Sequence, residues 1–387
     1  MKFSCTQENL RQGLSIVSHI ANKSVNLPIL ENVLIRTEDS GLKMMTTNLE
    51  MAVSCSVRGK VEGKGEFTVP SKLFADYVGL LPKERVDVEQ QEGALAVKCA
   101  SFETRLNGIN ASEFPLIPSV ERKRKFTVKV NELRSAVGQV LFAVASNESR
   151  PEISGVLFKF VPQSGGLKLV LAATDSYRLA ERSVSVKGDT PSTGSGQAGG
   201  EEQVSVIVPA RAVSELVRIL GVFKDTVDNP EDIEVVLSEN QVLFSYNQVE
   251  LISRTIDGKY PDYRQLVPGS FETEVKVQRD ELVRAVKATA LFSRTGLNDI
   301  TLKFAAGQPV KISAKNPQTG EHASEVPGEV TGKENGITVN YRYFVDGVNN
   351  IETDQVSLQL IDGVSPCLLR PDKDDANYLY IVMPIRQ

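Results

Sequence analysis

The sequence predicts an α+β fold built from three repeated domains, each with two helices packed on sheets. The main observation is a strand-then-helix phrase that occurs three times, as KFSCTQENLRQGL from Lys2, KFTVKVNELRSAV from Lys125 and EVKVQRDELVRAV from Glu274. In each copy a short alternating strand runs directly into a helix whose first two apolar residues are spaced i, i+4. These pairs are Leu10 and Leu14, Leu133 and Val137, and Leu282 and Val286. Three similar units favour an arc, a ring or an extended surface over a single catalytic cleft.

A second strand-then-helix phrase also occurs once in each third. Its copies are EFTVPSKLFADYVGLL from Glu66, VSVIVPARAVSELVRIL from Val204 and GITVNYRYFVDGVNNI from Gly336. Aligning Pro70, Pro209 and Asn340 brings one apolar residue of each helix into register, namely Phe74, Val213 and Phe344. Strand-helix alternation is common and can look periodic by chance, but two phrases in the same order three times favour triplication.

Length and composition fit a soluble globular protein. A chain of 387 residues should hold roughly two to four domains, each able to bury its own core. The hydrophobic fraction of 41% and the charged fraction of 24% are ordinary for such proteins. The sequence has no apolar run long enough to span a bilayer, and MKFSCTQENL lacks the basic and apolar regions of a signal peptide. We therefore expect a cytoplasmic protein with no membrane partner.

The cysteines and histidines form no recognisable metal or catalytic pattern. The four cysteines lie far apart with no CxxC spacing, at Cys5, Cys55, Cys99 and Cys367. The two histidines are His19 and His322. Because cysteine is often buried as a small hydrophobe, we interpret all four as structural thiols in a reducing compartment. We predict no metal site and no cofactor.

The sequence carries none of the common catalytic motifs. The sequence contains no GxxxxGK[ST] phosphate loop, GxSxG elbow, HExxH pair or dinucleotide fingerprint. The glycine-rich stretch at 188–203 precedes a strand rather than a helix, so we interpret it as a solvated surface loop. An enzyme would have to use Asp175, Arg178 and Asp262 as an acid-base cluster, yet no nucleophile or metal set accompanies them. Paired Asp and Arg residues are more often structural, and no catalytic residue is predicted.

Breaks in the pattern place the domain boundaries. The run ERKRK, residues 121–125, lies where the second copy of the first phrase begins, and VPGSF, residues 267–271, interrupts the pattern before the third. We therefore predict domains at residues 1–124, 125–270 and 271–387. The basic run would also fit a nucleic-acid patch, but five residues between domains are more often a solvated connection.

Four motifs give the chain a resemblance to a known family. They are LPIL (27–30), ATDSYRLA (173–180), IDGKYPDYRQLVP (256–268) and VMPIR (382–386). With these motifs and the triplication, the chain resembles the bacterial sliding clamps, the beta subunits of the replicative DNA polymerase III, over nearly its whole length.

The resemblance implies a head-to-tail homodimer that closes into a six-domain ring around duplex DNA, with helices lining the hole and sheets forming the outer wall. It implies a processivity factor rather than an enzyme. Its partners would be the DNA polymerase III catalytic subunit, the clamp loader and other proteins that carry a clamp-binding motif. The alternative is a repeat-built scaffold that binds peptides without encircling DNA.

Charge is consistent with a ring that slides. A net charge of −5 at pH 7 disfavours tight DNA binding, which depends on Lys and Arg neutralising phosphates. A ring held by topology needs only weak contacts. Basic residues recur on the exposed faces of the predicted helices, with small residues such as Gly13 between them, and the resemblance adds segments near Lys23 and Arg150. The predicted DNA-proximal residues are Lys23, Ser24, Lys72, Arg134, Arg150, Arg211, Arg218, Arg284, Lys287 and Arg342. Any solvated helix face carries basic residues, so the prediction depends on their recurrence.

The resemblance also implies a partner-peptide pocket between the second and third domains. Its residues would be Ile153, Thr174, Ser176, Tyr177, Arg178, Leu179, Pro261, Gln265, Leu266, Leu297, Asn340, Tyr343, Val364, Pro366, Ile381, Val382, Met383, Pro384, Ile385 and Arg386. Such apolar and amphipathic groups suit a peptide groove. We expect Leu179, Val364, Val382 and Met383 to bury an apolar anchor, and Arg178 to bind polar atoms of the peptide. Ser176, Tyr177 and Gln265 depart from one well-known family member, so the peptide preference is expected to shift.

Ring closure predicts contacts between the first and third domains of two chains. Edge strands near residues 101–107 and 298–304 are expected to pair, because an exposed strand edge must be covered. The predicted interface residues are Thr104, Leu106, Leu291 and Phe292, with the last two packing apolar surface across the junction.

Overall fold

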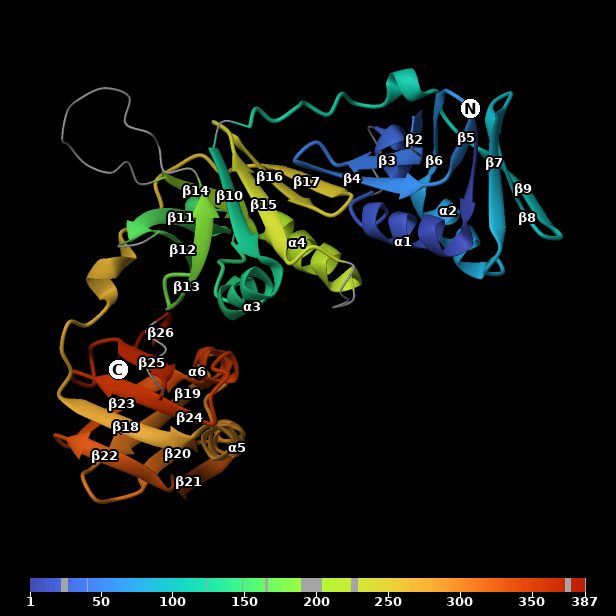
Figure 1. Cartoon of the computed structure of the whole chain (residues 1–387). Coiled ribbons are helices and arrows are strands. Elements are labelled where there is room, and N and C mark those ends of the chain that lie inside the picture. The colour runs from blue at the N-terminus through green and yellow to red at the C-terminus, as the bar shows by residue number, and fades with distance from the viewer. Residues whose placement is uncertain are drawn as a thin grey trace, which may run out of the picture. The chain divides into compact units, whose positions relative to one another are not determined.

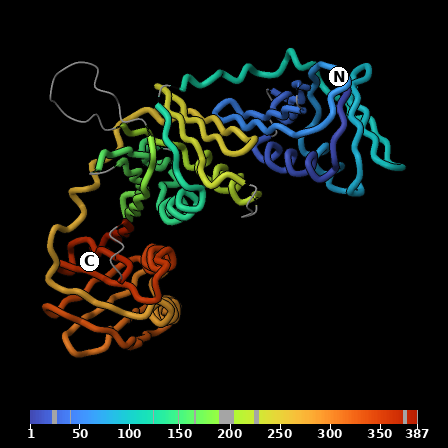
Figure 2. The backbone as a smooth tube through the Cα atoms, in the orientation of Figure 1, coloured from blue at the N-terminus to red at the C-terminus, as the bar shows by residue number. Residues whose placement is uncertain are grey.

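The computed structural model describes residues 1–21, 27–39, 41–122, 124–147, 149–163, 166–188, 204–223, 229–372 and 377–386. Of the predicted surface loop at 188–203, Gly188 ends a strand and the rest lies outside these residues, as do Lys23 and Ser24. The chain forms two compact units. The first comprises Met1–Asn131, Lys187–Ser192 and Ser214–Thr255, and the second comprises Glu132–Val186, Thr193–Val213 and Ile256–Gln387. The central third of the chain therefore contributes to both units, as the colours of Figures 1 and 2 allow the reader to follow.

Each copy of the first phrase folds as a strand followed directly by a helix. The pairs are β1 (Lys2–Thr6) with α1 (Gln7–Val17), β10 (Arg124–Lys129) with α3 (Val130–Leu141), and β18 (Thr273–Gln278) with α5 (Arg279–Ala290). The apolar residues spaced i, i+4 are buried in every copy, as predicted: Leu10, Leu14, Leu133, Val137, Leu282 and Val286. Residues four apart share one helix face, so each pair fixes the face that packs inward.

Each copy of the second phrase folds in the same way. The pairs are β6 (Glu66–Pro70) with α2 (Ser71–Leu80), β14 (Val204–Pro209) with α4 (Ala210–Val222), and β23 (Asn335–Asn340) with α6 (Tyr341–Asn349). The aligned apolar residues Phe74, Val213 and Phe344 are all buried. At the start of α6, the Asn340 side chain accepts a hydrogen bond from the Arg342 backbone N–H at 2.9 Å and caps the helix. The described residues thus hold two helices in each third, as the sequence predicted.

In the first unit, one sheet has the strand order β5-β1-β7-β8-β9, with β5 (Lys60–Gly63), β7 (Arg85–Gln91), β8 (Ala94–Cys99) and β9 (Phe102–Asn107). A second antiparallel set joins β6, β2 (Asn32–Glu38), β3 (Gly41–Thr47) and β4 (Met51–Arg58). Strand β4 then pairs with β17 (Val249–Arg254), which continues into β16 (Gln241–Tyr246), β15 (Asp232–Leu237) and β10. The β4–β17 pairing joins the first third of the chain to the central third.

In the second unit, the central third supplies β11 (Gly155–Gln163), β12 (Gly166–Thr174), β13 (Arg178–Gly188) and β14. Strand β13 pairs with β26 (Tyr378–Val382), which continues into β25 (Cys367–Pro371), β24 (Gln355–Leu360), β18 and β22 (Gly328–Gly332). A separate sheet has the order β21-β20-β19-β23, with β19 (Asp299–Phe304), β20 (Val310–Asn316) and β21 (Gly320–Val326). The β13–β26 pairing joins the central third to the last.

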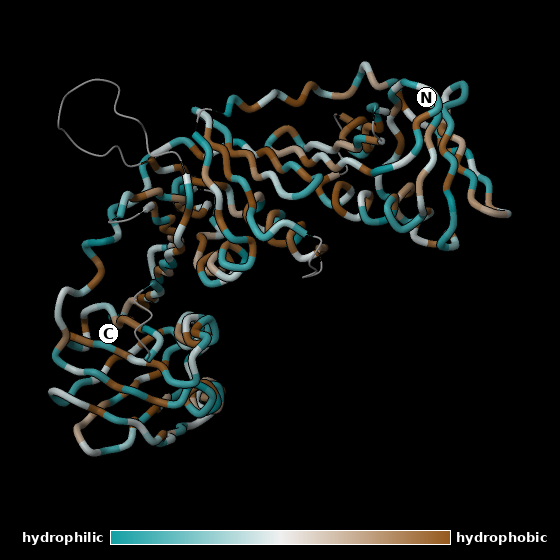
Figure 3. The backbone as a smooth tube through the Cα atoms, viewed as in Figure 1, coloured by the Kyte–Doolittle hydropathy of each residue, from teal (hydrophilic) through white to brown (hydrophobic). Residues whose placement is uncertain are grey.

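The core lies between the sheets and the helix pairs. Helix α1 packs against α2 in the first unit, and α5 packs against α6 in the second. Apolar and polar residues alternate along the strands, as the changing colour of the tube shows (Figure 3). In β18, for example, Thr273, Val275 and Val277 are buried while the residues between them are half-buried. This period of two places one face of the strand on the core.

Gly13 corrects one detail of the sequence analysis. We expected it among basic residues on the solvated face of its helix, but it is buried. A Cβ atom at this position would lie 2.5 Å from Met44 Cε and 2.6 Å from Val57 Cγ2. Glycine therefore lets α1 approach β3 and β4 closely.

The four cysteines are buried and unpaired, as expected for structural thiols. Burial raises the pKa of the Cys5, Cys55 and Cys367 thiols to about 12, so these thiols stay protonated at neutral pH. Within the described ranges, no group of three or more His, Cys, Asp or Glu residues could hold a metal ion. No helix in the described part of the chain is long and apolar enough to cross a membrane.

Candidate functional site

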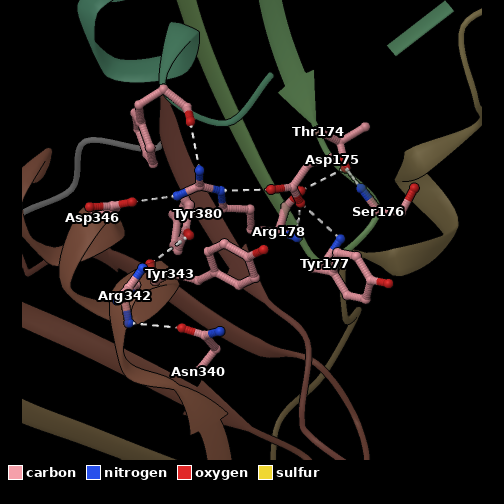
Figure 4. A network of polar contacts seen from close by, with 11 residues as sticks. Thr174, Asp175, Ser176, Tyr177, Arg178, Asn340, Arg342, Tyr343, Asp346 and Tyr380 are labelled. Carbon is pink, nitrogen blue, oxygen red and sulfur yellow. Dashed lines mark hydrogen bonds and ion pairs between the residues drawn. The ribbon is translucent and has the colours of Figure 1, made fainter. Parts of the chain in front are cut away.

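Arg178, at the start of β13, is the centre of a polar network in the second unit (Figure 4). Its side chain is 11% exposed. Nε donates to Asp175 Oδ2 at 3.0 Å, Nη1 to Asp346 Oδ2 at 2.6 Å and Nη2 to the Phe142 carbonyl at 2.8 Å. The guanidinium also lies over the Tyr343 ring, 4.6 Å from its centroid. One side chain thus ties the turn before β13 to the segment after α3 and to α6.

This network gives Arg178 a structural role that the sequence did not predict. Each guanidinium nitrogen donates to a group of the chain, so the side chain positions its neighbours, and the expected contact with a peptide stays a prediction. A largely buried guanidinium between two carboxylates is held firmly, because losing one partner leaves a less compensated charge. Sequence reasoning missed Asp346 and Phe142 because neither belongs to a motif shared with Arg178.

The turn between β12 and β13 is fixed by local hydrogen bonds. Thr174 Oγ1 donates to the Arg178 carbonyl at 2.6 Å and accepts from the Ser176 N–H at 3.1 Å. Asp175 Oδ1 accepts from the N–H groups of Tyr177 and Arg178 at 2.9 and 3.0 Å. Ser176 has a φ of 77°, in the left-handed region that non-glycine residues seldom adopt. The turn therefore holds Tyr177 outward, with its side chain 63% exposed.

The apolar groups that remain open to a partner are few. The Tyr177 ring stacks on Tyr343 of α6, with 6.3 Å between centroids and an interplanar angle of 19°. Leu266, Leu297 and Val364 are also exposed, by 42%, 45% and 70%. Leu297 lines a groove of about 960 Å³ together with Ile385 and Arg386, so the structure brings these three predicted residues together.

The C-terminal tail holds the same region by backbone contacts. Beyond β26, Met383 donates its N–H to the Tyr177 carbonyl at 2.9 Å. Ile385 donates to the Thr338 carbonyl in β23 at 2.8 Å, and Pro384 forms a β-bridge with Val339. The tail therefore spans from the turn before β13 to the edge of the four-stranded sheet.

Two predicted anchor residues belong to the core. Leu179 is 1% exposed and Val382 is 0% exposed, so neither presents a free surface to a peptide. Leu179 packs in a cluster with Ile153 and Ile381, and Met383 lies partly buried against that cluster. Of the four expected anchors, Met383 and Val364 keep exposed surface.

The other predicted pocket residues have local roles. Gln265 Nε2 donates to Asp262 Oδ2 at 2.9 Å, and both side chains are exposed. Pro261 and Pro366 are half-buried. Of the three residues considered as an acid-base cluster, Asp175 and Arg178 form an ion pair, whereas Asp262 accepts a hydrogen bond from Gln265.

The predicted DNA-proximal residues have varied surroundings. Those that are exposed are Lys72, Arg150, Arg211, Arg284, Lys287 and Arg342. Arg134 is half-buried. Arg150 donates from Nε to Glu152 Oε1 at 3.0 Å and from Nη1 to Ser176 Oγ at 2.9 Å, which places it at the turn before β13.

Arg218 is not on an exposed face, contrary to our expectation. Its Nη1 and Nη2 donate to the carbonyls of Ser15 and Ile16 at 3.0 and 2.6 Å, near the end of α1. Its Nη2 also donates to Glu215 Oε1 at 2.6 Å. Glu215 is 3% exposed, and its Oε2 lies 2.6 Å from His19 Nδ1, although the two residues are 196 positions apart. Arg218 therefore joins α4 to α1 within the first unit.

One predicted strand edge is correct and the other is wrong. Strand β9 is the last strand of its sheet, as expected. Strand β19, at residues 299–304, is internal, because it pairs with β20 on one side and β23 on the other. The two terminal strands of that sheet are β21 and β23, and β23 is contacted by the C-terminal tail. Strand β19 buries Ile300, Leu302 and Phe304 on one face, and such an alternating pattern does not show whether a strand is internal or at an edge.

Comparison with known families identifies the class of protein that this fold defines. Three family models, all of the DNA polymerase III beta subunit, match successive parts of the chain. The N-terminal domain matches residues 1–118, the central domain 127–262 and the C-terminal domain 264–386. The beta sliding clamp of Synechococcus elongatus is 30% identical over 392 residues, covering 100% of this chain and 99% of the relative. That of Bacillus subtilis is 27% identical, with full coverage of both chains.

Solved structures of similar fold are also sliding clamps. A sliding clamp from Pseudomonas aeruginosa bound to griselimycin is 29% identical, with a TM-score of 0.89 and complete coverage of both chains. The clamp of Bacillus subtilis is 26% identical, with a TM-score of 0.88. The chain belongs to the family of bacterial DNA polymerase III beta subunits, the beta sliding clamps. The predicted family and the predicted function, a DNA sliding clamp, are confirmed.

We predict that Arg178→Ala lowers the free energy of unfolding by about 3 kcal/mol, because it leaves Asp175 and Asp346 without their shared cation. Arg178→Lys should also destabilise, since one ammonium cannot reproduce the planar fork. Urea denaturation followed by circular dichroism measures both. Arg284→Ala, at an exposed position on α5, is the matched control and should change stability by less than about 0.5 kcal/mol. A fully stable Arg178→Lys variant would contradict the positioning role.

Proposed function

We propose that two copies of this chain join head to tail into a closed ring that encircles duplex DNA and acts, without catalysis, as the sliding clamp of a bacterial DNA polymerase III. The ring would contain six domains, with the limits 1–124, 125–270 and 271–387 in each chain, and would work on DNA in the cytoplasm. The observation that carries the proposal is the pairing of equivalent strand edges within the chain.

Two sets of strands occupy equivalent places in the three thirds. Strands β4, β13 and β21 are each the third strand after the first helix of their third. Strands β9, β17 and β26 are each the third strand after the second helix. Inside the chain, β4 pairs with β17 and β13 pairs with β26. The two strands of these sets that have no such partner within the described chain are β21 and β9, and each is the terminal strand of its sheet.

The leftover edges can be covered by a second copy. If β21 of one copy pairs with β9 of the other, the same antiparallel junction occurs at every domain boundary. Two such junctions close the assembly and leave none of these strands with an uncovered edge. Covering the edges matters because an exposed strand edge promotes aggregation. A head-to-tail contact that closes after a full turn produces a ring.

Apolar groups flank both edges. Leu291, after α5, is 76% exposed, and Phe292 stacks on His322 of β21 with 5.4 Å between ring centroids. Phe102, at the start of β9, is 48% exposed. Thr104 is half-buried, but Leu106 is only 6% exposed and faces its own core. We therefore propose that Leu106 contributes through its backbone and that Leu291 and Phe292 supply side-chain contacts.

We predict that Leu291→Asp combined with Phe292→Asp weakens dimerisation at least about 100-fold, because it places two charges in an apolar junction. Sedimentation equilibrium at micromolar concentration measures the effect, and circular dichroism verifies that the variant is folded. Ile361→Asp, at an apolar position 38% exposed in the same third, should leave the dimer intact. A monomeric wild-type protein, or an unaffected double variant, would refute the ring.

The exposed helix residues supply the DNA contacts in this proposal. Arg284 and Lys287 are three residues apart on α5 and share one exposed face. Together with Lys72, Arg211 and Arg342 they would offer scattered positive charge to phosphates. With a net charge of −5, the protein should bind DNA weakly and without sequence preference.

We predict that Arg284→Glu with Lys287→Glu reduces direct DNA binding and lowers the slope of log affinity against log salt by about 2, since two phosphate contacts are lost. Fluorescence anisotropy at several salt concentrations measures the slope. Lys60→Glu, at the start of β5, with Lys64→Glu, just after its end, makes the same charge change and should have little effect.

Retention on DNA tests encirclement separately from affinity. Wild-type protein loaded on nicked circles should stay bound in salt that abolishes direct binding, whereas it should leave linear DNA by sliding off the ends. Equal retention on circular and linear DNA would reject encirclement and favour the scaffold alternative.

The peptide pocket is the third part of the proposal. Tyr177, Tyr343 and Met383 lie around the Arg178 network, and the nearby tail offers backbone groups. We propose that this region binds a short linear peptide of the polymerase catalytic subunit, of the clamp loader and of other partners. A few apolar anchors would supply most of the binding free energy.

We predict that Met383→Ala weakens binding of a peptide from the polymerase catalytic subunit roughly tenfold. Deletion of residues 383–387 should abolish binding while the dimer persists, because it removes the contacts with Tyr177 and Thr338 but not β9 or β21. Gln387 itself lies outside the described residues. Fluorescence anisotropy measures the affinity, with Ile361→Ala as a control. Unchanged affinity in the truncated dimer would place the partner site elsewhere.

A further inference from the structure

The turn before β4 repeats the turn before β13 hydrogen bond for hydrogen bond. Thr47 Oγ1 donates to the Met51 carbonyl at 2.9 Å and accepts from the Leu49 N–H at 3.1 Å. Asn48 Oδ1 accepts from the N–H groups of Glu50 and Met51 at 3.1 and 2.9 Å. Leu49 has a φ of 74°, close to the 77° of Ser176. The residues 47–52 therefore occupy the place that 174–179 occupy in the second unit.

The segments on either side of this turn also match those on either side of the turn before β13. Arg254, at the end of β17, donates its N–H to the Glu50 carbonyl at 2.9 Å, as Met383 does to the Tyr177 carbonyl. On the other side, Ile109 forms a β-bridge with Thr68 of β6, as Ile256 does with Ile207 of β14. The segment after Ile109 then runs past Leu116, as the segment after Ile256 runs past Leu266. The first unit thus contains the framework of the proposed peptide pocket a second time.

In the first unit this framework encloses a slot of about 250 Å³. Its apolar lining includes Leu49, Met51, Ala52, Pro115, Leu116 and Ile252. Leu116 is 98% exposed and Leu49 is 49% exposed, although water disfavours exposed leucine side chains. Leu49 is also held in a left-handed conformation that costs a non-glycine residue free energy. Thr47, Gln241 and Arg254 offer polar groups at the margins of the slot.

We propose that this slot is a second peptide-binding site, which accepts one large apolar side chain of an extended segment in a partner protein. The choice of a peptide rests on the proposed function, because the slot copies the framework of the proposed peptide pocket. The volume lies just below the range of about 300–1,000 Å³ typical of small-molecule pockets, so it suits a single side chain. Gln241 and Arg254 donate to carbonyl oxygens of the peptide backbone.

The two sites differ in what the equivalent positions carry. Met51 stands where the second unit has Arg178, and Ala52 stands where it has Leu179. The slot therefore lacks the buried guanidinium network and has a smaller residue at its floor. We infer that it selects for the apolar side chain alone and binds more weakly than the pocket around Tyr177.

The methionines make the two sites separately observable. The chain has five, Met1, Met44, Met45, Met51 and Met383, of which Met51 lines the slot and Met383 the proposed pocket. Full-length dimer labelled with ¹³C at the methionine methyl groups is titrated with N-acetyl-leucyl-phenylalanine amide, and the five methyl resonances are followed by NMR. Met51→Leu and Met383→Leu assign the signals, and Met44 serves as a buried internal reference.

We expect the Met51 resonance to shift and saturate with its own dissociation constant. Leu116→Glu should weaken this constant roughly tenfold and leave the Met383 titration unchanged, because a fully exposed leucine is replaced without disturbing the core. Leu80→Glu, at another exposed leucine of the first unit, is the matched control and should change neither titration. A Met51 shift that survives Leu116→Glu would overturn the slot as the binding site.

The remaining outcomes separate this inference from the proposed function. A shift confined to Met383 overturns the second site and supports the pocket. A shift confined to Met51 supports the second site and contradicts the pocket. No shift of either resonance overturns both. Loss of the dimer in Leu116→Glu, seen by sedimentation, would assign the slot to contacts between copies and also overturn the inference.

Discussion

Coverage of strand edges is the constraint on which the rest of the structure depends. An edge strand exposes a row of unpaired N–H and C=O groups that will pair with whatever strand is available. Each third of this chain carries two such edges in equivalent places. Four of these six strand edges are paired within the chain, two by the β4–β17 pairing and two by the β13–β26 pairing. These pairings determine which third lies beside which. The helices, turns and tail are then placed by the strands to which they are attached.

The sequence predicted the elements because their determinants are local. The i, i+4 spacing of Leu10 and Leu14 depends only on neighbouring residues, and both side chains are buried as expected. Pairing between distant strands has no such local signal. The alternation along β19 shows one buried face, but it does not show that both edges of this strand are paired within the sheet.

Resemblance named the residues of the candidate site but did not predict the contacts that they make within the chain. Matching motifs named Arg178 and Leu179, yet the first is committed to Asp175 and Asp346 and the second belongs to the core. Arg218 shows the same limit, since its partners Ser15 and Ile16 lie in another third. A charged residue on a helix can point to solvent or to a neighbouring carbonyl, and only the fold decides between them.

The junctions inside the chain differ from a junction between copies in one respect that follows from covalent connectivity. From α3 to the last third, Ser135 Oγ donates to Glu352 Oε1 at 2.9 Å and Gln139 Nε2 donates to the Asn350 carbonyl at 3.1 Å. These contacts reform at a high effective concentration, because the chain keeps their partners close. A contact between copies has no tether, so its occupancy depends on the amount of protein present. In the ring proposed above, dilution would therefore separate the two contacts between copies first and release single chains whose internal strand pairings are intact.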